Sequence, residues 1–146
     1  NMNVLVIYNS RNGNTQDAAE AIAQAADNQF HTTVSTKSVI EVQQADVEQA
    51  DVIFVGTWVH GWILFGVRPA GAELWVPALP SLEGKPVGVF CTYAFNPRDS
   101  LRKLGAMLEE RGATLLGQRA FHRNRPDEGA EHFAQSILES AKRELA

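Results

Sequence analysis

The amino-acid sequence predicts an α/β fold, a three-layer sandwich in which a five-stranded parallel sheet lies between two layers of helices. Short apolar runs typical of buried strands alternate with amphipathic stretches typical of helices from one end of the chain to the other. Strands that are joined by helical crossovers run parallel, and right-handed crossovers cover both faces of the sheet. The chain has 146 residues, so we expect a single domain over residues 1–146.

Five apolar or alternating segments predict the strands. The runs at 3–8, 51–57 and 87–93 are apolar almost throughout, as in strands that are buried on both faces. The segment 30–35 alternates only weakly, which is typical of an edge strand, and 114–121 is expected to form the last strand.

Four segments predict helices, and a fifth is ambiguous. In residues 14–26, apolar side chains such as Ala18, Ala19 and Ile22 recur at helical spacing. Residues 39–49 are compatible with a loop or with one short turn of helix. The other predicted helices are residues 68–74, with Pro69 in the first turn, 99–111, ended by Gly112, and 129–145.

A small polar loop joins the first predicted strand to the first predicted helix. The amides at a helix start lack intrahelical partners and the helix dipole adds positive charge, so such a loop can bind an anion. Gly13 supplies the positive φ that the turn needs. The alternative is an ordinary polar loop with no ligand. The expected phosphate-binding residues are Ser10, Arg11, Asn12, Gly13, Asn14 and Thr15.

The residue types at these strand ends exclude several phosphate chemistries. The first loop has neither the lysine of a Walker loop nor the three spaced glycines of a dinucleotide fingerprint. A receiver domain would need an aspartate where Thr57 stands, and a low-molecular-weight phosphatase would need a cysteine in the first loop. We therefore expect a single phosphate bound without magnesium, and no catalytic side chain.

Aromatic residues follow the third and fourth predicted strands, whose carboxyl ends share the ligand edge of such a sheet. Trp58 is the expected flat wall for a planar ligand, with Trp62 as its rival, and Tyr93 is the candidate for the opposite face. Phe95 is the weaker candidate, with the core as its alternative place. The expected ligand-binding residues of these two loops are Thr57, Trp58, Val59, His60, Gly61, Thr92, Tyr93, Ala94 and Asn96.

The order and spacing of the three loops resemble the flavodoxin-like family along the whole chain. The first loop resembles the family's Thr-x-Thr-Gly-Asn-Thr phosphate loop, with Gly13, Asn14 and Thr15 identical to it. Residues 56–61 resemble the family's second flavin loop, and residues 82–90 resemble the approach to its fourth strand. The resemblance implies the strand order 2-1-3-4-5 and a short-chain member that binds FMN noncovalently.

The resemblance also implies roles for individual residues. Trp58 and Tyr93 would flank the isoalloxazine. Loop amides, including that of Gly13, would help the side chains that hold the FMN phosphate, which are those of Ser10, Asn12, Asn14 and Thr15.

Two features depart from the pattern of electron-carrier flavodoxins. The third loop lacks the Gly-x-Gly-Asp pattern that is common in those carriers, and the flavin loops contain Arg11 and Arg98 where acidic residues are usual. Residues 122–125, His-Arg-Asn-Arg, follow the last strand at the ligand edge. This run is either a solvated loop or a contact for an acidic partner or for nicotinamide phosphates.

Composition limits the partners and the location. The net charge of −4 argues against a nucleic-acid surface, and the only cysteine, Cys91, excludes an internal disulfide. No apolar stretch reaches membrane-spanning length and no Cys/His pairs have metal-ligand spacing, so we expect neither membrane nor metal binding. A cytoplasmic monomer or weak dimer is the expectation.

Three functions stay open at this point. The first is an FMN-binding redox protein that transfers electrons to or from a protein partner, such as a reductase or an acceptor. The second is a small FMN-dependent oxidoreductase, of NAD(P)H or quinone type, acting on a bound substrate. The third is a binding domain of the same fold with no cofactor. In the first two, the flavin supplies the chemistry and the protein supplies binding and electrostatics.

Overall fold

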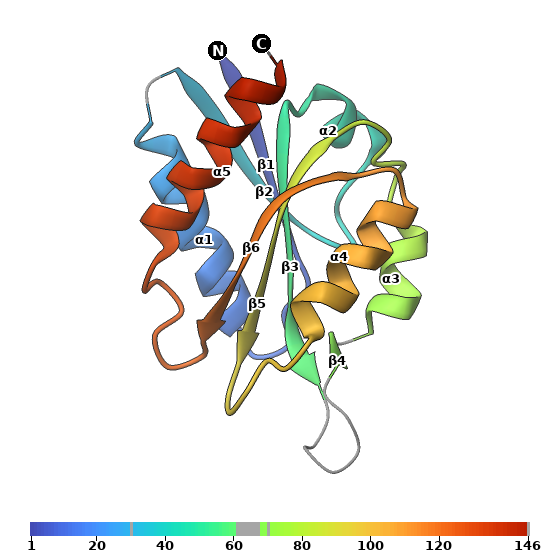
Figure 1. The fold of residues 1–146 in the computed structure, drawn as a ribbon, viewed down its shortest axis with the longest axis vertical. Coiled ribbons are helices and arrows are strands. Elements are labelled where there is room, and N and C mark those ends of the chain that lie inside the picture. Colours follow the sequence, from blue (N-terminus) through green and yellow to red (C-terminus); the bar gives the residue numbers. More distant parts are fainter. Residues whose placement is uncertain (30, 61–67, 70, 146) are drawn as a thin grey trace.

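The computed structural model describes residues 1–29, 31–60, 68–69 and 71–145, and of residues 60, 68 and 69 only the backbone. A twisted sheet lies between two helical layers, as Figure 1 shows. Its strands are β1 (Met2–Tyr8), β2 (Thr32–Ser38), β3 (Val52–His60), β4 (Arg68–Pro69), β5 (Pro86–Tyr93) and β6 (Thr114–His122). The helices are α1 (Asn14–Asp27), α2 (Gln44–Gln49), α3 (Ala72–Ala78), α4 (Ser100–Glu110) and α5 (Ala130–Leu145).

Five of the strands run parallel in the order β2-β1-β3-β5-β6. Counted without the two-residue β4, this is the order 2-1-3-4-5, so the predicted fold class is confirmed. The weakly alternating strand β2 lies at the edge, as its sequence predicted. The carboxyl ends of β3, β5 and β6 point to the lower edge in Figure 1, and both chain termini lie at the opposite edge.

Two apolar cores fill the space between the sheet and the helices. Helices α1 and α5 cover one face, where Phe54, Phe90 and Phe133 are buried. Helices α2, α3 and α4 cover the other face over Leu5, Ile53 and other side chains of the sheet. Burial on both faces explains why the central strands are almost continuously apolar, whereas the edge strand β2 alternates.

The helix predicted over residues 68–74 is present but begins four residues later than expected and extends to Ala78. Arg68 and Pro69 form β4, which pairs antiparallel with Val59 and His60 at the end of β3. Helix α3 begins only at Ala72, directly after Gly71, whose φ of 60° lies in the left-handed region. A left-handed residue cannot continue a right-handed helix, so the helix starts after Gly71 rather than before it.

The central strands approach one another closely beneath the ligand edge. A Cβ added to Gly56 of β3 would lie 2.3 Å from Cε2 of Phe90 on the neighbouring strand β5. The Phe90 ring is itself fully buried and meets Phe121 edge to face at 6.3 Å. Only glycine fits here, and the strand continues directly into Thr57 and Trp58.

Cys91 follows Phe90 in β5 and is buried as well. Its side chain is 1% exposed and makes no disulfide, and burial raises the pKa of its thiol to about 12. The thiol is therefore a small buried apolar group at neutral pH.

Candidate functional site

The segment after β1, the last residues of β3 and the segment after β5 meet at the carboxyl edge of the sheet, which is the lower edge in Figure 1. Parallel strands end at the same edge, so loops that are far apart in sequence come together there. Trp58 pairs with Thr92 in the β3–β5 ladder, and Tyr93 pairs with His122 in the β5–β6 ladder. The sheet therefore positions the second and third loops, and also the start of a fourth loop after β6.

The first loop is organised around the Ser10 hydroxyl. The backbone amides of Gly13 and Gln16 donate to Ser10 Oγ at 3.1 and 3.3 Å, and Gly13 has a φ of 89°. Both lone pairs of the hydroxyl oxygen are thus engaged, so its proton is left to donate to another acceptor. Within the described part of the chain, the amides of Asn14 and Thr15 have no partner, as expected at a helix start.

A buried hydrogen bond links the first loop to the third. The hydroxyl oxygens of Thr15 and Thr92 lie 2.7 Å apart, and the two residues are 1% and 2% exposed. A second link joins the ends of β1 and β3, where Asn9 Nδ2 donates to Thr57 Oγ1 at 3.1 Å. These contacts fix the three loops relative to one another.

Trp58 carries a cation on its ring face. The guanidinium of Arg11 lies 5.5 Å from the centre of the ring, within the range of a cation–π contact. Arg11 itself is exposed, whereas Trp58 is half-buried. One face of the Trp58 ring is thus covered by the Arg11 side chain rather than by the core.

Tyr93 is fixed on the other side of the site. Its ring meets the ring of His122 edge to face, with centres 5.2 Å apart and planes at 78°. The amide of Arg123 donates to the carbonyl of Tyr93 at 2.9 Å. The loop after β6 therefore supports the aromatic residue of the third loop.

A pocket with a volume of about 80 Å³ opens between these loops. The sequence did not identify Arg123 as a ligand-binding residue, although the run 122–125 was noted as a possible contact. Its position at the ligand edge was the only available signal. The pocket is lined by Arg11, Asn12, Asn14, Thr15, Trp58, Val59, Thr92, Tyr93, Ala94 and Arg123.

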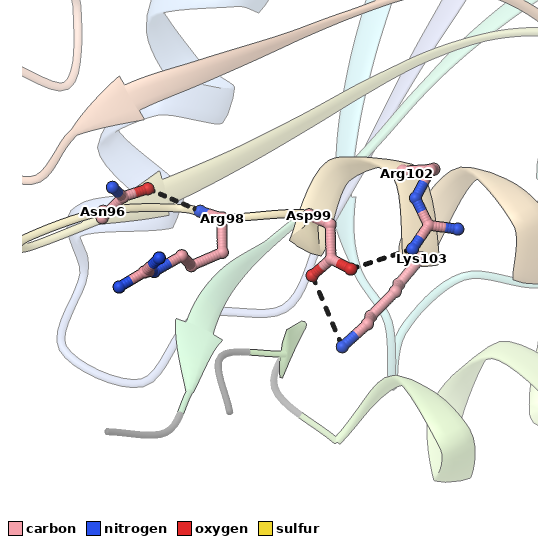
Figure 2. A network of polar contacts seen from close by, with 5 residues as sticks. All are labelled: Asn96, Arg98, Asp99, Arg102 and Lys103. Atoms are coloured by element: carbon pink, nitrogen blue, oxygen red, sulfur yellow. Dashed lines mark hydrogen bonds and ion pairs between the residues drawn. The ribbon is translucent and has the colours of Figure 1, made fainter. Parts of the chain in front are cut away.

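After the pocket, the third loop runs through Asn96 and Arg98 to Asp99 at the start of α4, as Figure 2 shows. The side-chain oxygen of Asn96 accepts a 2.8 Å hydrogen bond from the amide of Arg98, whose φ is 51°. Asp99 accepts from Arg102 at 2.8 Å and lies 3.4 Å from Lys103. The Arg102 hydrogen bond lowers the pKa of Asp99, with Lys103 adding to the effect, so this carboxylate stays ionised and compensated.

Several residues that were expected to bind the ligand do not line the pocket, and others lie outside the residues that the structure describes. Ser10 and Gly13 hydrogen-bond to each other within the first loop and are not among the pocket-lining residues. Thr57 is fully buried. The side-chain oxygen of Asn96 accepts a hydrogen bond from the amide of Arg98 in its own turn. Phe95 is 84% exposed, so the alternative that placed it in the core was wrong. The His60 side chain, Gly61 and Trp62 lie outside the described residues.

Unpaired helix-start amides, a hydroxyl proton and two aromatic side chains at one strand edge define an anion-binding α/β protein with an aromatic-walled pocket. These donors fit the phosphate of FMN, which only accepts hydrogen bonds when it is fully ionised. Among the described residues, no group of His, Cys, Asp and Glu side chains could hold a metal ion. No helix in the described ranges is long and apolar enough to cross a bilayer.

Comparisons with known proteins identify the family. A family model described as a flavodoxin domain matches residues 5–118. A flavodoxin of Maridesulfovibrio salexigens is 32% identical over 130 residues, which cover 77% of this chain and 80% of that protein. The solution structure of the two-electron reduced flavodoxin of Megasphaera elsdenii has a TM-score of 0.75 at 26% identity, covering 96% of this chain and 98% of that one.

A more distant likeness concerns the fold alone. The rubredoxin:oxygen oxidoreductase of Desulfovibrio gigas has a TM-score of 0.74 at 19% identity, over 99% of this chain but 37% of that larger protein. The same fold thus also occurs as one part of a longer chain.

The chain belongs to the flavodoxin family. It is a flavodoxin-like FMN-binding electron carrier that exchanges electrons with redox partners. The alternative of a small FMN-dependent oxidoreductase has no better support from these findings.

Proposed function

We propose that the first loop holds the FMN phosphate. The observation that carries this proposal is the state of the loop's donors: the amides of Asn14 and Thr15 have no partner among the described residues, and Ser10 Oγ has only its proton left to give. The helix dipole of α1 adds positive charge at the same point. Asn12, Asn14 and Thr15 line the pocket and complete the phosphate site.

We further propose that the isoalloxazine lies between Trp58 and Tyr93. Both rings line the pocket, on adjacent strands. Pockets for ligands of this size have about 300–1,000 Å³, whereas the present pocket has about 80 Å³. Arg11 therefore leaves the face of Trp58 when the ring binds. The cation–π contact that is lost at such an exposed site is worth only about 0.5–1 kcal/mol.

The protein's own part in electron transfer is then binding and electrostatics, since FMN supplies the redox chemistry when bound. Thr15 donates its hydroxyl proton to the phosphate, which requires Thr92 to donate to Thr15. The proposal includes a protein as the electron donor or acceptor, and a monomer or weak dimer. A cytoplasmic location is also part of it, supported by a chain that makes no internal disulfide.

The test is calorimetric titration of the apoprotein with FMN and with riboflavin. Each hydrogen bond to a charged group contributes about 1.5–3 kcal/mol, so FMN should bind more tightly by orders of magnitude. Ser10→Ala should reduce the difference in affinity between FMN and riboflavin, because it weakens FMN binding and leaves riboflavin binding unchanged. Ser35→Ala, on the exposed side of β2, is the matched control and should change neither affinity. Equal affinity for the two flavins would disprove the phosphate site.

The oxidoreductase alternative is tested on the same preparation. The visible spectrum is followed during stepwise reduction, and NADH and NADPH are tried as reductants. A carrier should react slowly with both nucleotides. Rapid reduction by either one would favour the enzyme.

A further inference from the structure

Three arginines from three different loops surround the pocket of a chain whose net charge is −4. We call Arg11, Arg98 and Arg123 the arginine rim. Arg11 and Arg123 line the pocket. Arg98 lies six residues after Thr92, the ladder neighbour of Trp58, in the loop that also supplies Ala94. All three side chains are exposed.

The arginine rim is not compensated by carboxylates within the described residues. Arg98 and Arg123 make no ion pair there, and Arg11 instead covers the ring of Trp58. Figure 2 shows the Arg98 side chain extending away from the Asp99 carboxylate, which is occupied by Arg102 and Lys103.

Acidic side chains near the pocket do not cancel this charge. Among the described residues, no aspartate or glutamate lines the pocket. Glu128, in the loop that follows Arg123, is held at 2.8 Å by Arg125. Asp17 and Asp127 are exposed and lie on the same side, but neither lines the pocket. The charged side chains that line the pocket, Arg11 and Arg123, are therefore both positive, although the whole molecule is negative.

An exposed aromatic residue lies beside this charge. Phe95 is 84% exposed and directly follows Ala94, which lines the pocket. Aromatic residues and arginine are the types most enriched at the centres of protein–protein interfaces. Phe95 and the arginine rim together thus have the residue types that are typical of a docking surface.

We propose that this face docks a redox protein whose own surface is acidic, with an apolar spot that receives Phe95. The proposal rests on FMN binding at the pocket and adds the chemistry of the partner. A nucleotide phosphate would be held by the pocket-lining arginines alone. It would leave Phe95 and Arg98 without a role, so a protein surface fits the whole set better.

The test uses the FMN-loaded protein and two probe proteins of opposite charge. A reduced, acidic plant-type ferredoxin is mixed with the oxidised protein in a stopped-flow instrument, and the flavin absorbance is followed. One electron leaves the ferredoxin cluster, which is oxidised, and enters the flavin, which is reduced. Basic cytochrome c, which takes one electron from the reduced protein, is the second probe.

The direction of the salt effect decides the proposal. Attraction to the arginine rim makes the second-order rate with ferredoxin fall as salt rises, and makes the rate with cytochrome c rise. The net charge of −4 acting as a whole would give the opposite signs for both probes. Those opposite signs would overturn the proposal.

Single variants locate the effect. Arg98→Glu and Arg123→Glu should each slow the ferredoxin reaction by about threefold to tenfold at low salt. The difference should disappear near 1 M salt, where the Debye length is about 3 Å. Phe95→Ser should slow it at every salt concentration. Arg143→Glu, the same charge change near the end of α5 at the opposite edge of the molecule, is the matched control and should stay within about twofold.

Two further outcomes and one control complete the test. A control variant as slow as the rim variants would overturn the proposal. Rapid reduction by NADPH that Arg123→Glu abolishes would assign the rim to a nucleotide instead. The flavin spectrum of every variant is recorded first, so that a failure to bind FMN is seen separately from a failure to dock.

Discussion

The hydroxyls of Thr15 and Thr92 form a 2.7 Å hydrogen bond between residues that are 77 positions apart in the sequence. Thr15 belongs to the first turn of α1 and Thr92 to the end of β5, so the bond joins the first loop to the third. Both residues are buried, and a buried hydroxyl without a partner is costly. This pair therefore couples the stability of the protein to the geometry of the site.

Thr92→Val should lower the free energy of unfolding by about 1–3 kcal/mol, because Thr15 is left as a buried hydroxyl without a partner. It should also weaken FMN binding, since Thr15 is no longer oriented toward the phosphate. Urea denaturation of the apoprotein and FMN titration measure the two effects. Thr92→Ser retains the hydroxyl and should stay close to the unsubstituted protein. If serine is as damaging as valine, the methyl group rather than the hydroxyl is what matters.

Trp58→Ala should weaken FMN binding by about 1–3 kcal/mol, the range measured for stacking of a nucleic-acid base on an aromatic side chain. Flavin fluorescence, which Trp58 should quench in the complex, should rise in the variant. Trp75→Ala is the control, since Trp75 lies half-buried on α3 and packs against the core between the sheet and helices α2, α3 and α4. Trp62→Ala tests the rival ring. If Trp62→Ala is the damaging change and Trp58→Ala is silent, the isoalloxazine lies elsewhere.

Arg123→Glu should lower the midpoint potential of the second electron. Fully reduced flavin is usually anionic near neutral pH, so a nearby cation stabilises it and a nearby carboxylate destabilises it. The shift should be larger at low salt, because exposed charges are screened. Arg98→Glu should act in the same direction but more weakly, since Arg98 does not line the pocket. A potentiometric titration measures both, and a rise in the second potential would contradict the argument.

Gly56→Ala should destabilise the protein by about 1–3 kcal/mol or more, because the added methyl group overlaps the buried Phe90 ring. Gly84→Ala is the comparison: its added carbon would meet nothing within 4 Å, so only the left-handed backbone, with a φ of 74°, opposes it. Urea denaturation measures both. Combining Gly56→Ala with Phe90→Leu should cost less than the sum of the two single changes, and strict additivity would contradict a clash between these groups.

The sheet was predictable because apolar runs mark buried strands whatever the details of their packing. The sequence did not predict β4, because Pro69 suits the first turn of a helix as well as an extended edge strand. Only the left-handed conformation of Gly71 shows that the helix begins after it. The turn at Asn96 was missed for a similar reason. An asparagine before Pro97 can bind a ligand or its own backbone, and the sequence does not distinguish these uses.

The sequence could place some residues of the site and not others. Residues that lie next to strand ends, such as Trp58 and Tyr93, could be placed at the pocket because parallel strands end together. Arg123 could not be placed there from sequence alone, since its position depends on the contact between Tyr93 and His122. Nor could the exposure of Phe95, which depends on the direction in which the loop turns after Ala94.

The inaccessible thiol of Cys91 gives the chain an internal reporter of its own unfolding. At 1% exposure, with a pKa of about 12, the sulfur cannot react with an alkylating reagent while β5 stays in place between β3 and β6. Labelling therefore requires the sheet to open, and its rate follows the population of opened molecules. The same single-site labelling, followed by mass spectrometry, measures how far a bound flavin or a docked partner suppresses that opening, without any change to the sequence.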